Sequence, residues 1–176
     1  MKTKNTPSNL AYLSLGSNIE PEINLPKAVE QLAQFGRIKA VSSVWQTAPV
    51  GFTEQPDFLN AAVLLETDLS AMVLRQKAIS YIENSLGRIR TENKNGPRTI
   101  DIDIMLFNHD VITIGARHIP DPELLKRSFV AIPMAEIAPN YVHPEAKVTL
   151  VEIARQFNPA TEAIIRREGV DLIGAN

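Results

Sequence analysis

The sequence contains no cysteine and no long run of apolar residues. Without cysteine there can be no disulfide, no thiolate metal site and no cysteine nucleophile. No apolar stretch approaches the roughly 20 residues that a membrane-spanning helix needs. Residues 1–9 include two lysines, but no apolar run of signal-peptide length follows them. These absences predict a cytoplasmic protein with no membrane partner.

An excess of either charge is also lacking. Eighteen lysine and arginine residues face 20 aspartate and glutamate residues, which leaves a net charge of −2. Such a balance gives no overall field that would attract nucleic acid. Aromatic residues make up 6% of the chain, with no basic stripe interleaved among them, as single-stranded RNA binding would require. We therefore expect no nucleic-acid partner.

The length of 176 residues suits one domain with a substantial hydrophobic core. The apolar fraction of 44% is typical of globular proteins. We expect a single domain over residues 10–160, with tails at residues 1–9 and about 161–176.

Hydrophobic periodicity and turn residues predict the order of the secondary structure elements. The order is β-α-β-β-α-β, followed by a hairpin strand and short helices, which is typical of a ferredoxin-like α+β fold with an antiparallel sheet. The predicted strands are 10–15, 37–45, 58–66, 99–107 and 111–114, where the last forms a hairpin with the strand before it. The predicted helical segments are 24–35, 70–86, 123–130, 133–137 and 148–157.

The stretch from Gly96 to Ile104 carries the strongest chemical signal. Isoleucines alternate there with polar residues, so Asp101 and Asp103 lie on one face of a strand, about 6.5 to 7 Å apart at Cα. Two like charges at this spacing repel, and aspartate is disfavoured in strands. A hard divalent cation between the carboxylates would remove the repulsion, and Arg98 beside them suits a phosphate group. The alternative is that both aspartates form the solvated face of a half-exposed strand.

The stretch Gly96–Met105 resembles the signature of the 6-hydroxymethyl-7,8-dihydropterin pyrophosphokinase family of the folate pathway. The resemblance covers roughly residues 10–145, and an ordered set of such blocks is far more specific than any one of them. The further blocks that match in family order include Leu15–Asn18, Thr47–Pro49, Gln55–Asn60, Leu86–Arg88, Arg127–Val130 and Glu136–Pro139.

The resemblance implies transfer of a diphosphate from ATP, the co-substrate, to the hydroxymethyl group of the pterin, with release of AMP. It implies that Asp101 and Asp103 hold two Mg²⁺ ions that bridge the ATP phosphates. It also implies small-molecule substrates alone as partners, in a monomer or weak dimer.

Four arginines match family positions that contact phosphates. Arg88 and Arg98 correspond to catalytic arginines that lie against the transferring phosphates and bind ATP. Arg90 and Arg127 correspond to further ATP-binding positions. The alternative for all four is solvated surface charge, which is the usual state of arginine.

Five further residues match the family's pterin site. Phe58 and Phe129 correspond to aromatic positions that sandwich the pterin ring, and Asn60 offers donors and acceptors to the ring edge. Thr47 and Val50 lie where family backbone groups contact the pterin. The alternative is that both phenylalanines belong to the core.

Two acidic residues are weaker candidates. Glu83 matches an acidic position near the family's site, or is an exposed helical glutamate. Asp121 lies between Pro120 and Pro122, where the family usually has a histidine that contacts the nucleotide phosphates. We expect Asp121 to weaken ATP binding or to add a magnesium contact.

Two other functions remain open at this point. One is a catalytically weak ferredoxin-like module that binds a nucleotide, which would show no turnover with pterin. The other is a magnesium-dependent phosphohydrolase, which would release phosphate or diphosphate without an acceptor. The set of Phe58, Asn60 and Phe129 favours the pterin kinase, because neither alternative needs an aromatic slot.

Overall fold

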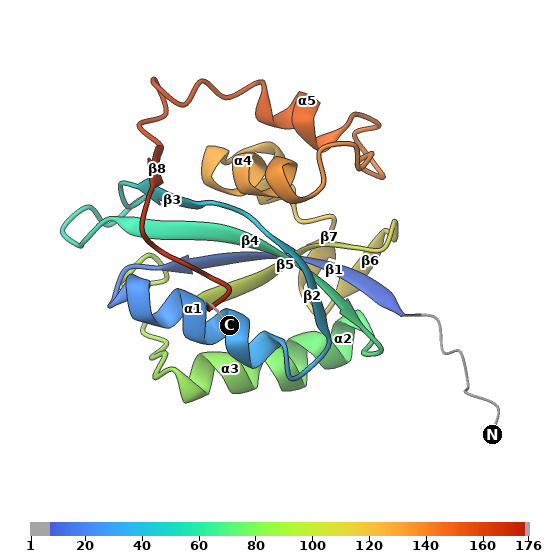
Figure 1. The fold of residues 1–176 in the computed structure, drawn as a ribbon, viewed down its shortest axis with the longest axis horizontal. Coiled ribbons are helices and arrows are strands. Elements are labelled where there is room, and N and C mark those ends of the chain that lie inside the picture. Colours follow the sequence, from blue (N-terminus) through green and yellow to red (C-terminus); the bar gives the residue numbers. More distant parts are fainter. Residues whose placement is uncertain (1–7, 175–176) are drawn as a thin grey trace.

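A computed structural model describes residues 8–174, in which helices pack on an antiparallel sheet (Figure 1). The sheet follows the order β5-β1-β4-β3-β8, and β2 also pairs with β4. Every pair of neighbouring strands in it is antiparallel, which makes the fold α+β. The strands are β1 (Asn9–Ser17), β2 (Arg37–Val41), β3 (Val44–Thr47), β4 (Phe58–Thr67), β5 (Asp101–Phe107) and β8 (Ile165–Arg167).

Helices cover both faces of the sheet (Figure 1). One face carries α1 (Pro21–Leu32) and a composite helix made of α2 (Ala71–Val73), a π-helical turn η1 (Leu74–Ile79) and α3 (Ser80–Ser85). The other face carries α4 (Ser128–Ile137) and α5 (Leu150–Ala154). None of the helices in residues 8–174 combines the length and apolar character needed to cross a bilayer.

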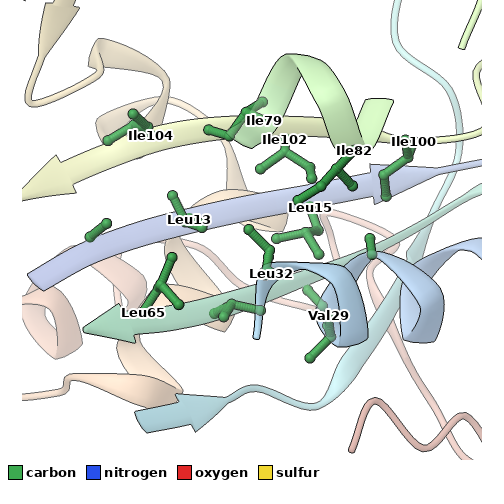
Figure 2. Close-up of a cluster of buried hydrophobic side chains, with 14 of the residues drawn as sticks. Leu13, Leu15, Val29, Leu32, Leu65, Ile79, Ile82, Ile100, Ile102 and Ile104 are labelled. Atoms are coloured by element: carbon green, nitrogen blue, oxygen red, sulfur yellow. The ribbon is translucent and has the colours of Figure 1, made fainter. Parts of the chain in front are cut away.

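The alternation of side chains along β5 determines which face of the sheet the two aspartates occupy. Ile100, Ile102 and Ile104 are buried against the layer of α1 and α3 (Figure 2). Because successive side chains of a strand point to opposite faces, Asp101 and Asp103 point to the face that carries α4. A second apolar cluster beneath α4 and α5 covers only part of that face, and includes Tyr12, Ala62, Leu106, Val130, Met134 and Leu150.

The first helix begins three residues earlier than predicted. Pro21 starts α1, which suits proline because its missing N–H needs no partner in the first turn. Asn24, the first residue of the predicted range, is buried inside the helix and donates from Nδ2 to the carbonyl of Ile19 at 2.6 Å. The helix ends at Leu32 rather than Phe35.

The predicted strand 37–45 is two strands, because regular strand pairing is interrupted at Ser42 and Ser43. Ser42 bonds β4 with both its N–H and its hydroxyl, which accepts from the Ala62 N–H at 2.8 Å. The next N–H, of Ser43, donates to the Glu136 carboxylate at 2.8 Å, and the Trp45 indole N–H donates to the other oxygen at 2.5 Å. Between β2 and β3, side-chain oxygens thus accept from the backbone N–H groups of Ala62 and Ser43.

The predicted pairing of 111–114 with the preceding strand is wrong. Instead β6 (Ile112–Ile114) pairs with β7 (Arg117–Ile119) in a separate two-stranded sheet. A turn centred on Gly115, whose φ is +60°, makes this closer pairing available.

The C-terminal third also differs from the prediction. A 3₁₀ turn η2 (Pro122–Leu125) precedes α4, which continues through Pro133 as one helix. The amphipathic segment 148–157 contains the short helix α5, with a capping box formed by Thr149 and Glu152. The expected tail after residue 160 contributes β8 to the sheet, while the expected tail at residues 1–7 lies outside the described residues.

Candidate active site

A cavity of about 570 Å³ opens on the α4 face of the sheet, and ten of the predicted site residues line it. An adjoining hollow of about 420 Å³ is lined by Arg88 and Arg90, and the two share Arg98, Asp101 and Arg117. The ten residues of the main cavity are Thr47, Val50, Phe58, Asn60, Arg98, Asp101, Asp103, Asp121, Arg127 and Phe129.

Three guanidinium groups neutralise the two carboxylates of β5. Asp101 accepts from Arg98 Nη1 at 2.8 Å through Oδ2 and from Arg88 Nη1 through Oδ1. Asp103 accepts from Arg117 Nη1 through Oδ1. The protein therefore supplies its own counter-ions to these acids.

The two carboxyl groups differ in acidity. Burial alone would raise the pKa of Asp101, but the guanidinium groups of Arg88 and Arg98 outweigh it and hold the pKa below its ordinary value. For Asp103, burial and the nearby charge of Asp101 raise the pKa to about 6, against the opposing charges of Arg117 and Arg75. The site thus favours the ionised form of Asp101 and disfavours the ionised form of Asp103.

The carboxylate pair fits a magnesium site that relies on its substrate for further ligands. Mg²⁺ prefers oxygen ligands, and commonly binds through one or two carboxylates plus phosphate oxygens and water. Both carboxylates line the same cavity, and the charge of Asp101 opposes ionisation of Asp103, which a bound cation would favour. Within residues 8–174 no group of three or more His, Asp or Glu side chains is arranged to hold a metal. The donor set therefore suits Mg²⁺ carrying a nucleotide.

The pKa of Asp103 predicts how cation binding depends on pH. A ligand carboxyl must be ionised, and with a pKa of about 6 the Asp103 carboxyl is protonated below that pH and ionised above it. We expect Mn²⁺ binding, followed by electron paramagnetic resonance, to be about tenfold weaker at pH 5 than at pH 7. Asp103→Asn should bind weakly at both pH values. Equal wild-type affinity at both pH values would contradict the assignment.

Glu83 lies beside β5, where it accepts from the Ile102 N–H, and does not line the cavity. Its side chain is 3% exposed, so the alternative of an exposed helical glutamate is wrong. It accepts from Arg88 Nη1 at 2.8 Å and from Arg90 Nη2 at 2.7 Å. A buried carboxylate needs such partners, and here it also orients both arginines.

Arg98 is held from several sides at the mouth of the cavity. Its side chain donates to the carbonyls of Lys94 at 2.5 Å and Gly96 at 3.2 Å, and its guanidinium lies 5.7 Å from the centre of the Phe58 ring. Its backbone N–H donates to Asn18 Oδ1 at 2.8 Å. These contacts fix the arginine between the aromatic wall and Asp101.

The apolar end of the cavity contains the predicted pterin residues. Asn60 Nδ2 donates to Thr47 Oγ1 at 2.9 Å, while Oδ1 faces Gly16. A methyl group on Gly16 would lie 3.4 Å from that oxygen, so the glycine keeps this end of the cavity open. Phe58 and Phe129 are both partly buried, and both line the cavity. Each ring can therefore pack against the core on one side and face the cavity on the other.

The remaining candidates lie on the η2 side of the cavity. Asp121 caps η2 by accepting from the Glu123 N–H at 2.9 Å, and burial raises the pKa of its carboxyl. Arg127 Nε donates to the Glu123 carboxylate at 2.8 Å.

Sequence reasoning assigned no role to Arg117 or Asn18. Arg117 reaches Asp103 because β7 pairs with β6, a pairing that the sequence pattern did not predict. Asn18 belongs to a matched block, and its membership of that block is the sequence signal for a role in the site. It donates to Gln55 Oε1 at 2.9 Å as well as accepting from Arg98, so it connects two loops of the site.

The chain is similar to named pyrophosphokinases over most of its length. It is 44% identical over 133 residues to the 2-amino-4-hydroxy-6-hydroxymethyldihydropteridine pyrophosphokinase of Bacillus subtilis, covering 74% of this chain and 78% of that protein. The enzyme of that name from Haemophilus influenzae is 35% identical over 150 residues, covering 84% and 92%.

Other similar proteins are much longer than this chain. The folic acid synthesis protein FOL1 of Dictyostelium discoideum is 37% identical over 146 residues, which is 82% of this chain and 22% of that protein. A crystal structure of Plasmodium falciparum HPPK-DHPS shares the fold, with a TM-score of 0.69 at 15% identity, over 88% of this chain and 46% of that one.

The family model of 7,8-dihydro-6-hydroxymethylpterin-pyrophosphokinase (HPPK) matches residues 12–139, which include every predicted site residue. The chain therefore belongs to the HPPK family.

Proposed function

We propose that this protein transfers a diphosphate from ATP to the hydroxymethyl group of 6-hydroxymethyl-7,8-dihydropterin and releases AMP, in folate biosynthesis. One observation carries the proposal: the carboxylate pair of β5 and the side chains of Phe58, Asn60 and Phe129 line the same cavity. Membership of the HPPK family and the names of the relatives support the same reaction.

Asp101 and Asp103 would hold two Mg²⁺ ions. When bound, the ions neutralise phosphate charge and orient the attacked phosphorus. The residues of the protein then contribute position and electrostatics.

Binding of Mg²⁺ and ATP exchanges the counter-ions of the site. Before binding, Arg88 and Arg98 pair with Asp101, and Arg117 pairs with Asp103. If the carboxylates held the metal, these guanidinium groups would be free to bind phosphate oxygens, which they match in geometry. Arg88 and Arg98 lie against the transferring phosphates. The exchange makes metal and nucleotide binding mutually favourable.

Two further arginines extend the ATP site. Arg90 lines the adjoining hollow and Arg127 lines the main cavity. Arg90 is held by Glu83 and Arg127 by Glu123, so each remains on its own side of the phosphates.

The pterin lies between Phe58 and Phe129, whose faces suit a flat heteroaromatic ring. Asn60 Oδ1 accepts from the ring edge, and the backbone at Thr47 and Val50 completes the contact.

Replacing Asp121 tests its proposed effect on ATP. Its carboxylate lines the cavity close to where phosphates bind, so Asp121→His removes a like charge and adds a donor. We expect the KM for ATP to fall about fivefold, the equivalent of about 1 kcal/mol. Asp121→Asn, which keeps the cap of η2, should give a smaller decrease. An unchanged KM in both variants would reject the effect.

The proposal also covers the topology of the fold, the extent of the domain, and the oligomeric state and location of the protein. The element order and the strand order β5-β1-β4, with β2 and β3 beyond, support a ferredoxin-like core. We propose that residues 10–160 belong to one domain, which includes the family match at 12–139 and whose sheet is extended by β8. We further propose a cytoplasmic monomer or weak dimer with ATP and dihydropterin as its ligands.

The decisive experiment measures AMP formation from ATP and Mg²⁺, with and without 6-hydroxymethyl-7,8-dihydropterin. We expect AMP only when the pterin is present. Phosphate or diphosphate release without pterin would indicate a hydrolase. Nucleotide binding with no product in either mixture would indicate a binding module.

A further inference from the structure

The strand that carries Asp101 and Asp103 has one edge without a neighbouring strand. Within residues 8–174, β5 is the last strand of the sheet and pairs with β1 alone. The backbone groups of Ile100 and Ile102 point to the open edge. Because the aspartates lie next to these two residues in the chain, the contacts at this edge determine where the carboxylates stand.

Three side chains of the α2–α3 segment and the loop after it bond this edge. Arg88 Nη1 donates to the Ile100 carbonyl at 3.2 Å. Glu83 Oε1 accepts from the Ile102 N–H at 3.1 Å, and Arg75 Nη1 donates to the Ile102 carbonyl at 3.1 Å. Arg75, Glu83 and Arg88, here called the edge latch, thus make the bonds that a neighbouring strand would make.

The π turn brings Arg75 into the edge latch. Arg75 and Glu83 are eight residues apart, and on a regular α-helix their side chains would differ in direction by about 80°. The π turn Leu74–Ile79 takes up one extra residue. The remaining seven residues fall only about 20° short of two full turns, so both side chains face β5.

Arg75 contacts the strand without entering the reaction site. It lines neither the main cavity nor the adjoining hollow, whereas Arg88 lines the hollow. Its bond to Ile102 is charge-assisted and half-buried, and is therefore stronger than a neutral hydrogen bond.

We propose that Arg75 is a positioning residue for the metal site: it fixes the backbone of Ile102 and thereby the spacing of Asp101 and Asp103. The inference rests on the proposed function, which makes these aspartates the metal ligands. Outer partners that orient metal ligands typically change affinity by about 10- to 100-fold when removed.

The test compares Mn²⁺ binding, by electron paramagnetic resonance with a non-hydrolysable ATP analogue present, in wild type and three variants. Arg75→Met removes the donor, and Arg75→Lys keeps a charge with a shorter reach. Lys77→Met is the matched control, because Lys77 is an exposed cation on the same π turn. Thermal unfolding of each variant is recorded in parallel, and Arg75→Gln replaces Arg75→Met if the latter does not fold.

We expect Mn²⁺ affinity to fall at least about tenfold in Arg75→Met, to recover partly in Arg75→Lys and to stay unchanged in Lys77→Met. Affinity within twofold of wild type in folded Arg75→Met would overturn the inference, even if that variant unfolds at a lower temperature. If wild type itself binds no Mn²⁺, the proposed metal site fails and the inference fails with it. Failure of the inference alone leaves wild-type binding and pterin-dependent AMP formation intact.

Discussion

Asp103→Ala is expected to lower pterin-dependent AMP formation by at least about 10³-fold, since the metal contributes several kcal/mol of charge stabilisation. The variant removes one of the two carboxylates that line the cavity and leaves Asp101 in place. Under the proposed function, Asp101 alone would be left to hold the Mg²⁺ ions that the two carboxylates would hold together. The rate is measured at saturating ATP and pterin, with Mg²⁺ in excess.

Loss of folding would not explain this result. Burial and, after it, the charge of Asp101 raise the pKa of Asp103 to about 6, so replacing Asp103 removes a carboxyl whose ionised form the site disfavours. We expect the thermal midpoint of Asp103→Ala to equal or exceed that of wild type. Asp68→Ala changes an exposed aspartate far along the chain and should leave the rate unchanged. An Asp103→Ala rate within tenfold of wild type would remove Asp103 from the metal site.

Arg98→Ala should lower kcat by about 10³-fold, the smaller end of the effect seen for arginines that stabilise a transferring phosphoryl group. The structure holds this guanidinium between the Phe58 ring and Asp101, where the proposed pterin and metal sites would meet. It is therefore placed to bind the phosphate nearest the pterin. Steady-state AMP formation gives kcat and KM separately.

Arg98→Lys separates charge from geometry. Lysine keeps the positive charge but has no planar fork, so it cannot bind Asp101 and the loop carbonyls at once. We expect a kcat between those of wild type and Arg98→Ala. Arg155→Ala, which changes an exposed arginine at the end of α5, is the control and should have no effect. A kcat of Arg98→Ala within tenfold of wild type would contradict the role.

Local patterns predicted the parts of the site that depend on strand periodicity. The alternation in β5 predicted that Asp101 and Asp103 share a face opposite the isoleucines, and the described burial has this arrangement. The α+β class followed from the element order for the same reason, because each strand and helix has its own apolar period.

Features that depend on tertiary pairing were not predictable in this way. Arg117 reaches Asp103 through the pairing of β6 with β7, which local alternation cannot distinguish from a hairpin with β5. The π turn was also missed, since the spacing of Leu74, Ala78 and Ile82 fits a regular α-helix. The extra residue in the π turn becomes apparent only from the bonds to β5, where Arg75 and Glu83 both reach Ile102.

The edge latch has a consequence for self-association. An open strand edge invites another chain to add a strand, and proteins suppress this with short, charged or covered edges. Here the latch covers β5 at one end of the sheet. At the other end, β8 has three residues, two of them Arg166 and Arg167, and β2 carries Arg37 and Lys39. Arg75 and Arg88 thus occupy two backbone carbonyls that a strand from another chain would need for pairing with β5.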